Sequence, residues 1–78
     1  MIDTGFQDVL YQARRLLHES PFVELHRIDV QRSGETVCLR GEVETFFLKQ
    51  LAQETVRAAT RGLEVHNDVL VRLKRRVH

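Results

Sequence analysis

The period of the apolar residues changes three times along these 78 residues, and this pattern limits the possible folds most strongly. From Phe6 to Leu17 apolar residues recur every three or four positions, as on one face of an amphipathic helix. Ser20-Pro21 ends that stretch, because the residue before a proline is pushed out of the α region. The same period returns after Thr45, a candidate helix cap, and Gly62 suits the left-handed C-terminal cap of that stretch. We therefore predict helices over about 5–19 and about 45–60.

Three other segments alternate apolar and polar residues with period two, which is typical of half-buried strands. Ser33-Gly34 predicts a turn joining the first two into an antiparallel hairpin. Gly41 lies within an apolar row, where a missing side chain indicates a bend or the close approach of another backbone. Asn67 interrupts the apolar row of the last segment, and a buried amide needs partners, so we expect it to bond the main chain it faces. The predicted strands cover about 25–32, 35–43 and 63–74.

The resulting order of elements is α-β-β-α-β, in one domain over residues 1–78. A strand–helix–strand connection crosses over right-handedly, which places the third strand parallel to the second in a mixed sheet ordered 1-2-3. An all-antiparallel sheet ordered 2-1-3 is the alternative. Each strand has only one fully apolar row, so both helices should cover the same face of the sheet. The predicted class is α+β, with a three-stranded mixed sheet and both helices on one face.

Composition excludes several classes of protein. Cys38 is the single cysteine and cannot form an internal disulfide. Twelve basic and eleven acidic residues leave a net charge of +1, so only local clusters of charge carry information. The first residues lack a basic start followed by an apolar run, and no apolar run reaches the roughly 18 residues of a membrane-spanning helix. We expect a cytoplasmic location if the chain is full length.

Two strand motifs and the helix between them resemble a known family. The segment 37–43, VCLRGEV, resembles the V-x-L-x-G-x-V strand of BON domains (bacterial osmotically inducible protein and nodulation domain). A helix with Ala52 and Val56 follows at the expected distance. The segment 65–71, VHNDVLV, is similar to the V-x-N-x-L-x-V ending of the family. The resemblance covers nearly the whole chain, from Phe6 to about Leu73.

The chain departs from the family pattern before its last strand. The family usually has a glycine one position before Gly62, where this chain has Arg61. The resemblance implies a non-enzymatic domain associated with cell envelopes, where several members are thought to bind phospholipid or attach proteins to membranes. It also implies an envelope-associated location if this chain is a segment of a longer protein.

Catalysis and metal binding are not predicted. The four histidines show no paired-ligand spacing, and His26 and His66 would approach each other only in the 2-1-3 order, so we predict neither metal nor cofactor. Cys38 lies in mid-strand, whereas a nucleophile needs a base and usually a loop or helix start. A flat sheet offers no cleft to raise the pKa of one carboxyl group in a catalytic pair. The carboxylates considered are Asp29, Glu42 and Asp68.

The most informative local cluster of charge is the basic end of the chain, residues 72–78. Its cations are Arg72, Lys74, Arg75 and Arg76. Near an anionic bilayer each such charge contributes ~1 kcal/mol, so four predict a weak but measurable attachment. The alternative is a solubilising chain end. Nucleic acid is not favoured, because the aromatic residues are not interleaved with the basic ones.

Phe46 and Phe47 begin the second predicted helix, where only one of them can point fully inward. The other, together with Leu70 on the outer sheet face, predicts a contact patch. The two edge strands also leave backbone groups that can pair with another chain. The resemblance to BON domains, together with the basic end, implies a non-catalytic module that binds anionic phospholipid surfaces. The alternative is a protein–protein or self-association module that uses a sheet edge or the open sheet face.

Overall fold

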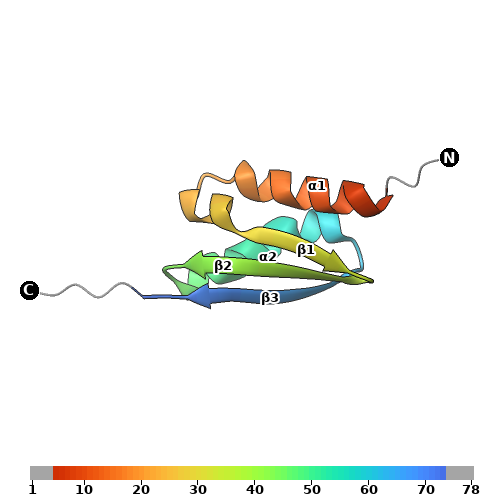
Figure 1. The fold of residues 1–78 in the computed structure, drawn as a ribbon. Coiled ribbons are helices and arrows are strands. Elements are labelled where there is room, and N and C mark those ends of the chain that lie inside the picture. Colours follow the sequence, from red (N-terminus) through yellow and green to blue (C-terminus); the bar gives the residue numbers. More distant parts are fainter. Residues whose placement is uncertain (1–4, 74–78) are drawn as a thin grey trace, which may run out of the picture.

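Two helices lie on one face of a three-stranded sheet in the computed structural model, and the other face is open (Figure 1). The structure describes residues 5–73, with side chains from Val9 onward. The predicted α+β class and the order of its helices and strands are confirmed. In chain order the elements are α1 (Gly5–His18), the 3₁₀ helix η1 (Val23–Arg27), β1 (Asp29–Ser33), β2 (Thr36–Val43), α2 (Phe46–Thr60) and β3 (Glu64–Val71).

The strand order is β1-β2-β3, which excludes the 2-1-3 alternative. β1 and β2 are antiparallel, and the pairing of Ser33 with Thr36 leaves a two-residue turn in which Gly34 has φ +60°. β3 runs parallel to β2, with Thr36 opposite Glu64 and Val43 opposite Val71. The connection through α2 is thus the crossover that a parallel pair requires.

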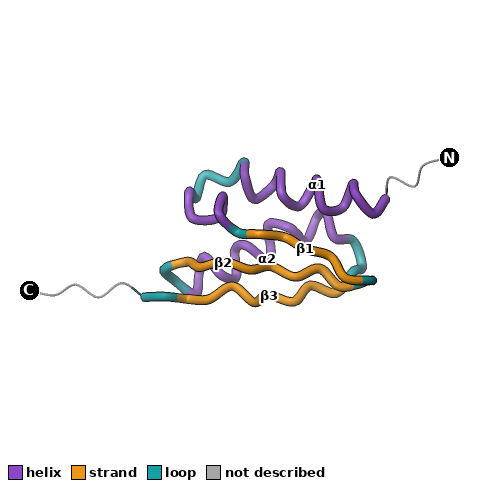
Figure 2. Tube along the Cα trace, viewed as in Figure 1, coloured by secondary structure: helices purple, strands orange, loops and turns teal. Residues whose placement is uncertain are grey.

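The predicted first strand, 25–32, is wrong at its start. Residues Val23–Arg27 form η1, and β1 begins only at Asp29 (Figure 2). Leu25 is fully buried between the half-buried Glu24 and the exposed His26, so a single 3₁₀ turn imitates the alternation of a strand. The last strand also ends earlier than predicted. It stops at Val71, and the Leu73 side chain is 66% exposed rather than part of the inner row.

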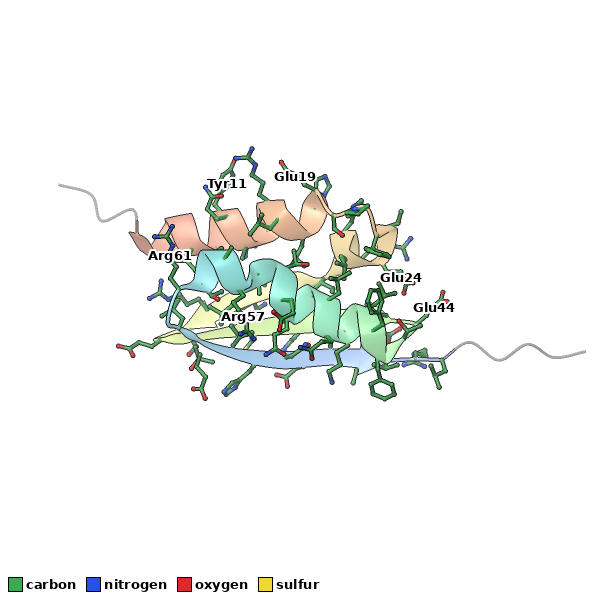
Figure 3. All side chains as sticks on the ribbon, turned by 180° about the vertical axis from the view of Figure 1, so that it is seen from behind. Tyr11, Glu19, Glu24, Glu44, Arg57 and Arg61 are labelled. Carbon is green, nitrogen blue, oxygen red and sulfur yellow. The ribbon has the colours of Figure 1, made fainter. Side chains whose placement is uncertain are left out.

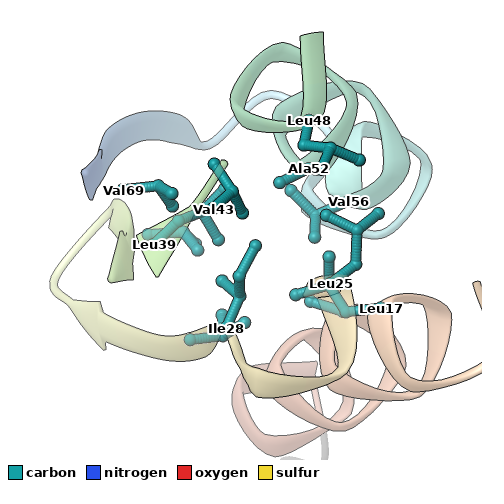
Figure 4. Close-up of a cluster of buried hydrophobic side chains, with 12 residues drawn as sticks. Leu17, Leu25, Ile28, Leu39, Val43, Leu48, Ala52, Val56 and Val69 are labelled. Carbon is teal, nitrogen blue, oxygen red and sulfur yellow. The ribbon is translucent and has the colours of Figure 1, made fainter. Parts of the chain in front are cut away.

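One apolar cluster fills the space between the sheet and the helices (Figure 4). Burial of a Leu or Val side chain stabilises a fold by about 1.5–3 kcal/mol, so this cluster is the main source of stability. η1 contributes to it through Leu25, which lies as deep as the strand residues. The buried apolar residues are Ala13, Leu17, Leu25, Ile28, Val30, Val37, Leu39, Val43, Leu48, Ala52, Val56 and Val69.

Two backbone positions depend on the absence of a Cβ atom or on a rare conformation. A Cβ at Gly41 would lie 3.3 Å from the Cα of Ile28, so the two backbones approach closely there. Close approach is one of the two alternatives that the sequence left open for this glycine. Gly41 also has φ +148°. The turn between α2 and β3 contains Gly62 at φ +80° and Arg61 at φ +27°. Arg61, which stands where the family has glycine, thus adopts a conformation that glycine adopts more readily.

Candidate binding surface

η1, the start of α2 and the ends of β2 and β3 meet at one end of the molecule (Figure 1). Several large apolar side chains of these elements are exposed there. Phe22 and Phe47 are in edge-to-face contact, with ring centroids 5.8 Å apart, although they are 41% and 61% exposed. Val23 and Phe46 are more exposed still, at 66% and 70%. We refer to Phe22, Val23, Phe46 and Phe47 as the apolar end. Clustered exposure of large apolar groups marks an interaction site, whereas single exposed residues do not.

The cap of α2 positions both phenylalanines of this helix. The Thr45 hydroxyl accepts a hydrogen bond from the Leu48 amide at 3.1 Å, as expected of an N-cap. Leu48 takes the inward-facing position and is 7% exposed. Neither Phe46 nor Phe47 points fully inward, so both phenyl rings are left exposed.

The elements around the apolar end are joined by specific hydrogen bonds. The Glu24 carboxylate accepts from the Glu44 amide at 2.8 Å, which ties η1 to the loop before α2. Glu24 and Glu44 lie at the same end of the molecule in Figure 3. The Arg72 amide donates to the Val43 carbonyl at 2.8 Å, which brings the chain after β3 to the same loop. The apolar end is thus presented on a fixed backbone.

Arg72 is the one member of the predicted basic cluster that lies within the described residues. Its guanidinium lies 3.0 Å from the Glu42 carboxylate, with side chains 72% and 52% exposed. Both residues line a groove of about 350 Å³ beside the apolar end. An exposed ion pair of this kind stabilises a fold by at most ~1 kcal/mol, so Arg72 can exchange its partner at little cost. Lys74, Arg75 and Arg76 lie outside the described residues.

The open face of the sheet carries polar side chains in rows across the strands. Asp29, Arg40 and Asp68 form one row, with the arginine between the two acids. In the next row Cys38 lies beside His66, a neighbour that sequence spacing does not reveal. Both stand on a flat strand pair, and Cys38 is a half-buried free thiol. Leu70 is also on this face, opposite Glu42 and 58% exposed.

Asn67 ties β3 to α2. Its Nδ2 donates to the Lys49 carbonyl at 2.8 Å and to Gln53 Oε1 at 3.2 Å. Its Oδ1 accepts from the Val69 amide at 3.2 Å. The hydrogen bond to the Lys49 carbonyl is the main-chain bond expected for an amide in this apolar row. It gives Asn67 a structural role.

The structure brings together two histidines that lie eight residues apart in the sequence. The rings of His18 and His26 have centroids 5.2 Å apart, in a groove of about 430 Å³ between α1, η1 and β1. Tyr11 and Arg15 line the same groove. The hydrogen bond and charge of the nearby Glu19 carboxylate raise the pKa of the Arg15 guanidinium. Within residues 5–73, no group of three or more His, Cys, Asp or Glu side chains is arranged to hold a metal ion.

Fold and surface together define a small α+β binding module. The model of the BON domain family matches residues 12–72, well over half of the chain. The chain therefore belongs to the BON domain family, which is a non-catalytic family. Neither the curated proteins nor the solved structures contain a match. None of the helices described here is both long enough and apolar enough to span a bilayer.

Proposed function

We propose that this BON domain is a non-enzymatic module that attaches to anionic phospholipid surfaces. The apolar end would enter the interface while Arg72, Lys74, Arg75 and Arg76 meet the headgroups. The observation that carries the proposal is the exposure of Phe46, Phe47 and Phe22 at the end of the domain where Arg72 also lies.

The phenyl rings and the basic residues would contribute free energies of membrane binding of similar size. Full burial of one phenyl ring contributes about 1.5–3 kcal/mol, and partial insertion contributes less. Each basic residue near an anionic surface adds ~1 kcal/mol. Neither group alone gives stable attachment, in the same way that one acyl chain gives only marginal membrane binding. We therefore expect binding that needs both the rings and the anionic headgroups.

A protein partner or a second copy of the chain is the second candidate, since Leu70 is exposed on the open sheet face. Pairing along a sheet edge is opposed by two contacts. Arg14 Nη2 donates to the Val30 carbonyl on edge strand β1 at 2.9 Å. Asn67 Oδ1 accepts the Val69 amide on edge strand β3. Natural sheets use such devices to prevent pairing with another chain, so these contacts favour the lipid candidate.

The test is co-sedimentation with anionic and with neutral liposomes at low and at physiological salt. We expect the protein to sediment only with anionic liposomes, and less as salt rises, because salt screens exposed charges. The variant Phe46→Ser/Phe47→Ser should reduce binding about tenfold, which corresponds to the loss of roughly 1.4 kcal/mol of apolar contact. The variant Arg75→Glu/Arg76→Glu should abolish sedimentation.

Tyr11→Ser is the matched control, because Tyr11 is an aromatic residue of similar exposure, 60%, on α1 rather than at the apolar end. It should sediment like the wild type. Equal losses in Tyr11→Ser and in the double phenylalanine variant would show that the apolar end has no special role. Sedimentation unchanged by the charge reversal would contradict the role of the basic residues. A dimer by light scattering without sedimentation would favour self-association.

A further inference from the structure

We propose that His18 and His26 form a two-ligand site for a divalent late transition metal ion such as Zn²⁺. Imidazole nitrogen binds zinc at about 2.0–2.1 Å, which puts each ring centroid about 3.2 Å from the ion. Two such rings on a tetrahedral ion have centroids about 5 Å apart. The observed separation is 5.2 Å, with the ring planes inclined by 41°. The separation of the two ring centroids therefore matches the one expected for two imidazoles on a shared ion.

The hydrogen bond of His26 prepares this ring for metal binding. His26 Nε2 lies 2.7 Å from the carbonyl oxygen of Ser20. A carbonyl can only accept, so Nε2 carries the proton and donates it. In the neutral ring the lone pair is then on Nδ1. Histidines that bind metals commonly donate their other ring N–H to a backbone carbonyl in this way, which fixes the tautomer and the orientation of the ring.

The charges around the two rings tolerate a cation. Arg14 and Arg15 line the groove, and the charge of Arg15 is balanced by its ion pair with Glu19 at 2.9 Å. Arg14 is directed to the Val30 carbonyl and keeps its charge. Asp29 also lines the groove and supplies a negative charge. His18 is in the last turn of α1, where the partial negative charge of the helix end favours a cation.

Two imidazoles occupy only part of a tetrahedral shell, and water would complete it. Such a site exchanges its ion readily. Among imidazole sites the affinity for divalent ions rises from Co²⁺ to Ni²⁺ to Cu²⁺, with Zn²⁺ below Cu²⁺. A shared ion would link the end of α1 to η1, and the segment between the two histidines includes Phe22 and Val23 of the apolar end.

The test is titration of the chain with ZnCl₂, followed by calorimetry and by the imidazole resonances in NMR spectra. We expect one Zn²⁺ per chain and concerted shifts of the His18 and His26 resonances. His18→Ala and His26→Ala should each weaken binding by at least about tenfold, because loss of a mere outer-shell partner of a metal ligand already costs about 10–100-fold. Zn²⁺ should also raise the Tm of the wild type and not that of His18→Ala, because a ligand that binds only the folded state stabilises it.

His66→Ala is the matched control. His66 is similarly exposed and lies beside Cys38, so this pair is the most plausible competing site. Zn²⁺ affinity and the Tm increase should be unchanged in His66→Ala. Loss of binding in His66→Ala with retention in His18→Ala would overturn the proposal. So would a titration in which the His18 and His26 resonances do not move.

Discussion

The two ends of the domain differ in the kind of side chain that they expose to solvent. At one end the β1–β2 turn and the α2–β3 turn close the fold with Gly34, Arg61 and Gly62, and polar side chains surround them. At the other end η1 and the start of α2 leave phenyl rings exposed. Figure 3 shows Arg57 and Arg61 at the first end and Glu24 and Glu44 at the second.

The core is equally complete beneath both ends. Below the apolar end, Leu25 is fully buried, Val43 is 2% exposed and Leu48 is 7% exposed. The exposed rings are thus not core residues that failed to pack. The two ends therefore differ in their exposed side chains: among the described residues, the large exposed phenyl rings lie at the apolar end and not beside the two turns.

Leu25→Ala, at the apolar end, is expected to have the largest effect on the free energy of unfolding. If η1 is part of the core, removing a fully buried leucine should lower the free energy of unfolding by about 2–5 kcal/mol, enough to unfold much of a domain this small. Leu25→Met keeps the volume and should cost less than about 1.5 kcal/mol. Urea unfolding followed by circular dichroism measures both. A loss below about 1 kcal/mol for Leu25→Ala would show that η1 merely rests on the surface.

A smaller loss of stability is expected for Gly41→Ala, which tests how β2 supports the apolar end. The added Cβ would meet the Ile28 backbone at 3.3 Å, and φ +148° strains any L residue, so we expect a loss of about 1–3 kcal/mol. Gly34→Ala at the turn end is the comparison. Nothing lies within 4 Å of its added Cβ, so only the conformational cost of about 1–2 kcal/mol remains. Equal losses in the two variants would mean that the contact with Ile28 is not restrictive.

The fold could be predicted from the sequence because the apolar residues of each element recur with a single dominant period. The pattern left two strand orders open, since both place the same residues on the inner face. The start of the first strand was predicted wrongly at Leu25, because one buried residue between less buried neighbours fits a 3₁₀ turn as well as a strand.

The candidate sites could be predicted only in part, because their exposed residues do not follow the periods that define the fold. Phe46 and Phe47 stood out because two adjacent phenylalanines cannot share one inward position. Phe22 and Val23 were missed, because after Pro21 no period tells an exposed apolar residue from a buried one. The pairing of His18 with His26 arises from the turn between α1 and η1, which spacing alone does not indicate.

At the turn end we expect a gain in stability from Arg61→Gly. An L residue in the left-handed region costs about 1–2 kcal/mol, and the extra chain entropy of glycine offsets about 0.5–1 kcal/mol of the relief. The net gain should be about 0.5–1 kcal/mol, measured as a higher urea midpoint with an unchanged m-value. Gly62→Ala, at φ +80° in the same turn, should have the opposite sign. A loss for Arg61→Gly would mean that the arginine side chain stabilises the turn.

The smallest effect on stability is expected at the apolar end itself, for Phe46→Ser. This side chain is 70% exposed, so its removal should change the free energy of unfolding by no more than about 0.5 kcal/mol. Urea unfolding of this variant beside Leu25→Ala compares an exposed and a buried apolar residue of the same end. Unchanged stability together with weaker liposome sedimentation would separate the binding role of the ring from the packing beneath it. A loss above about 1 kcal/mol would instead make Phe46 part of the core, and the contrast between the two ends would then be one of packing rather than of binding.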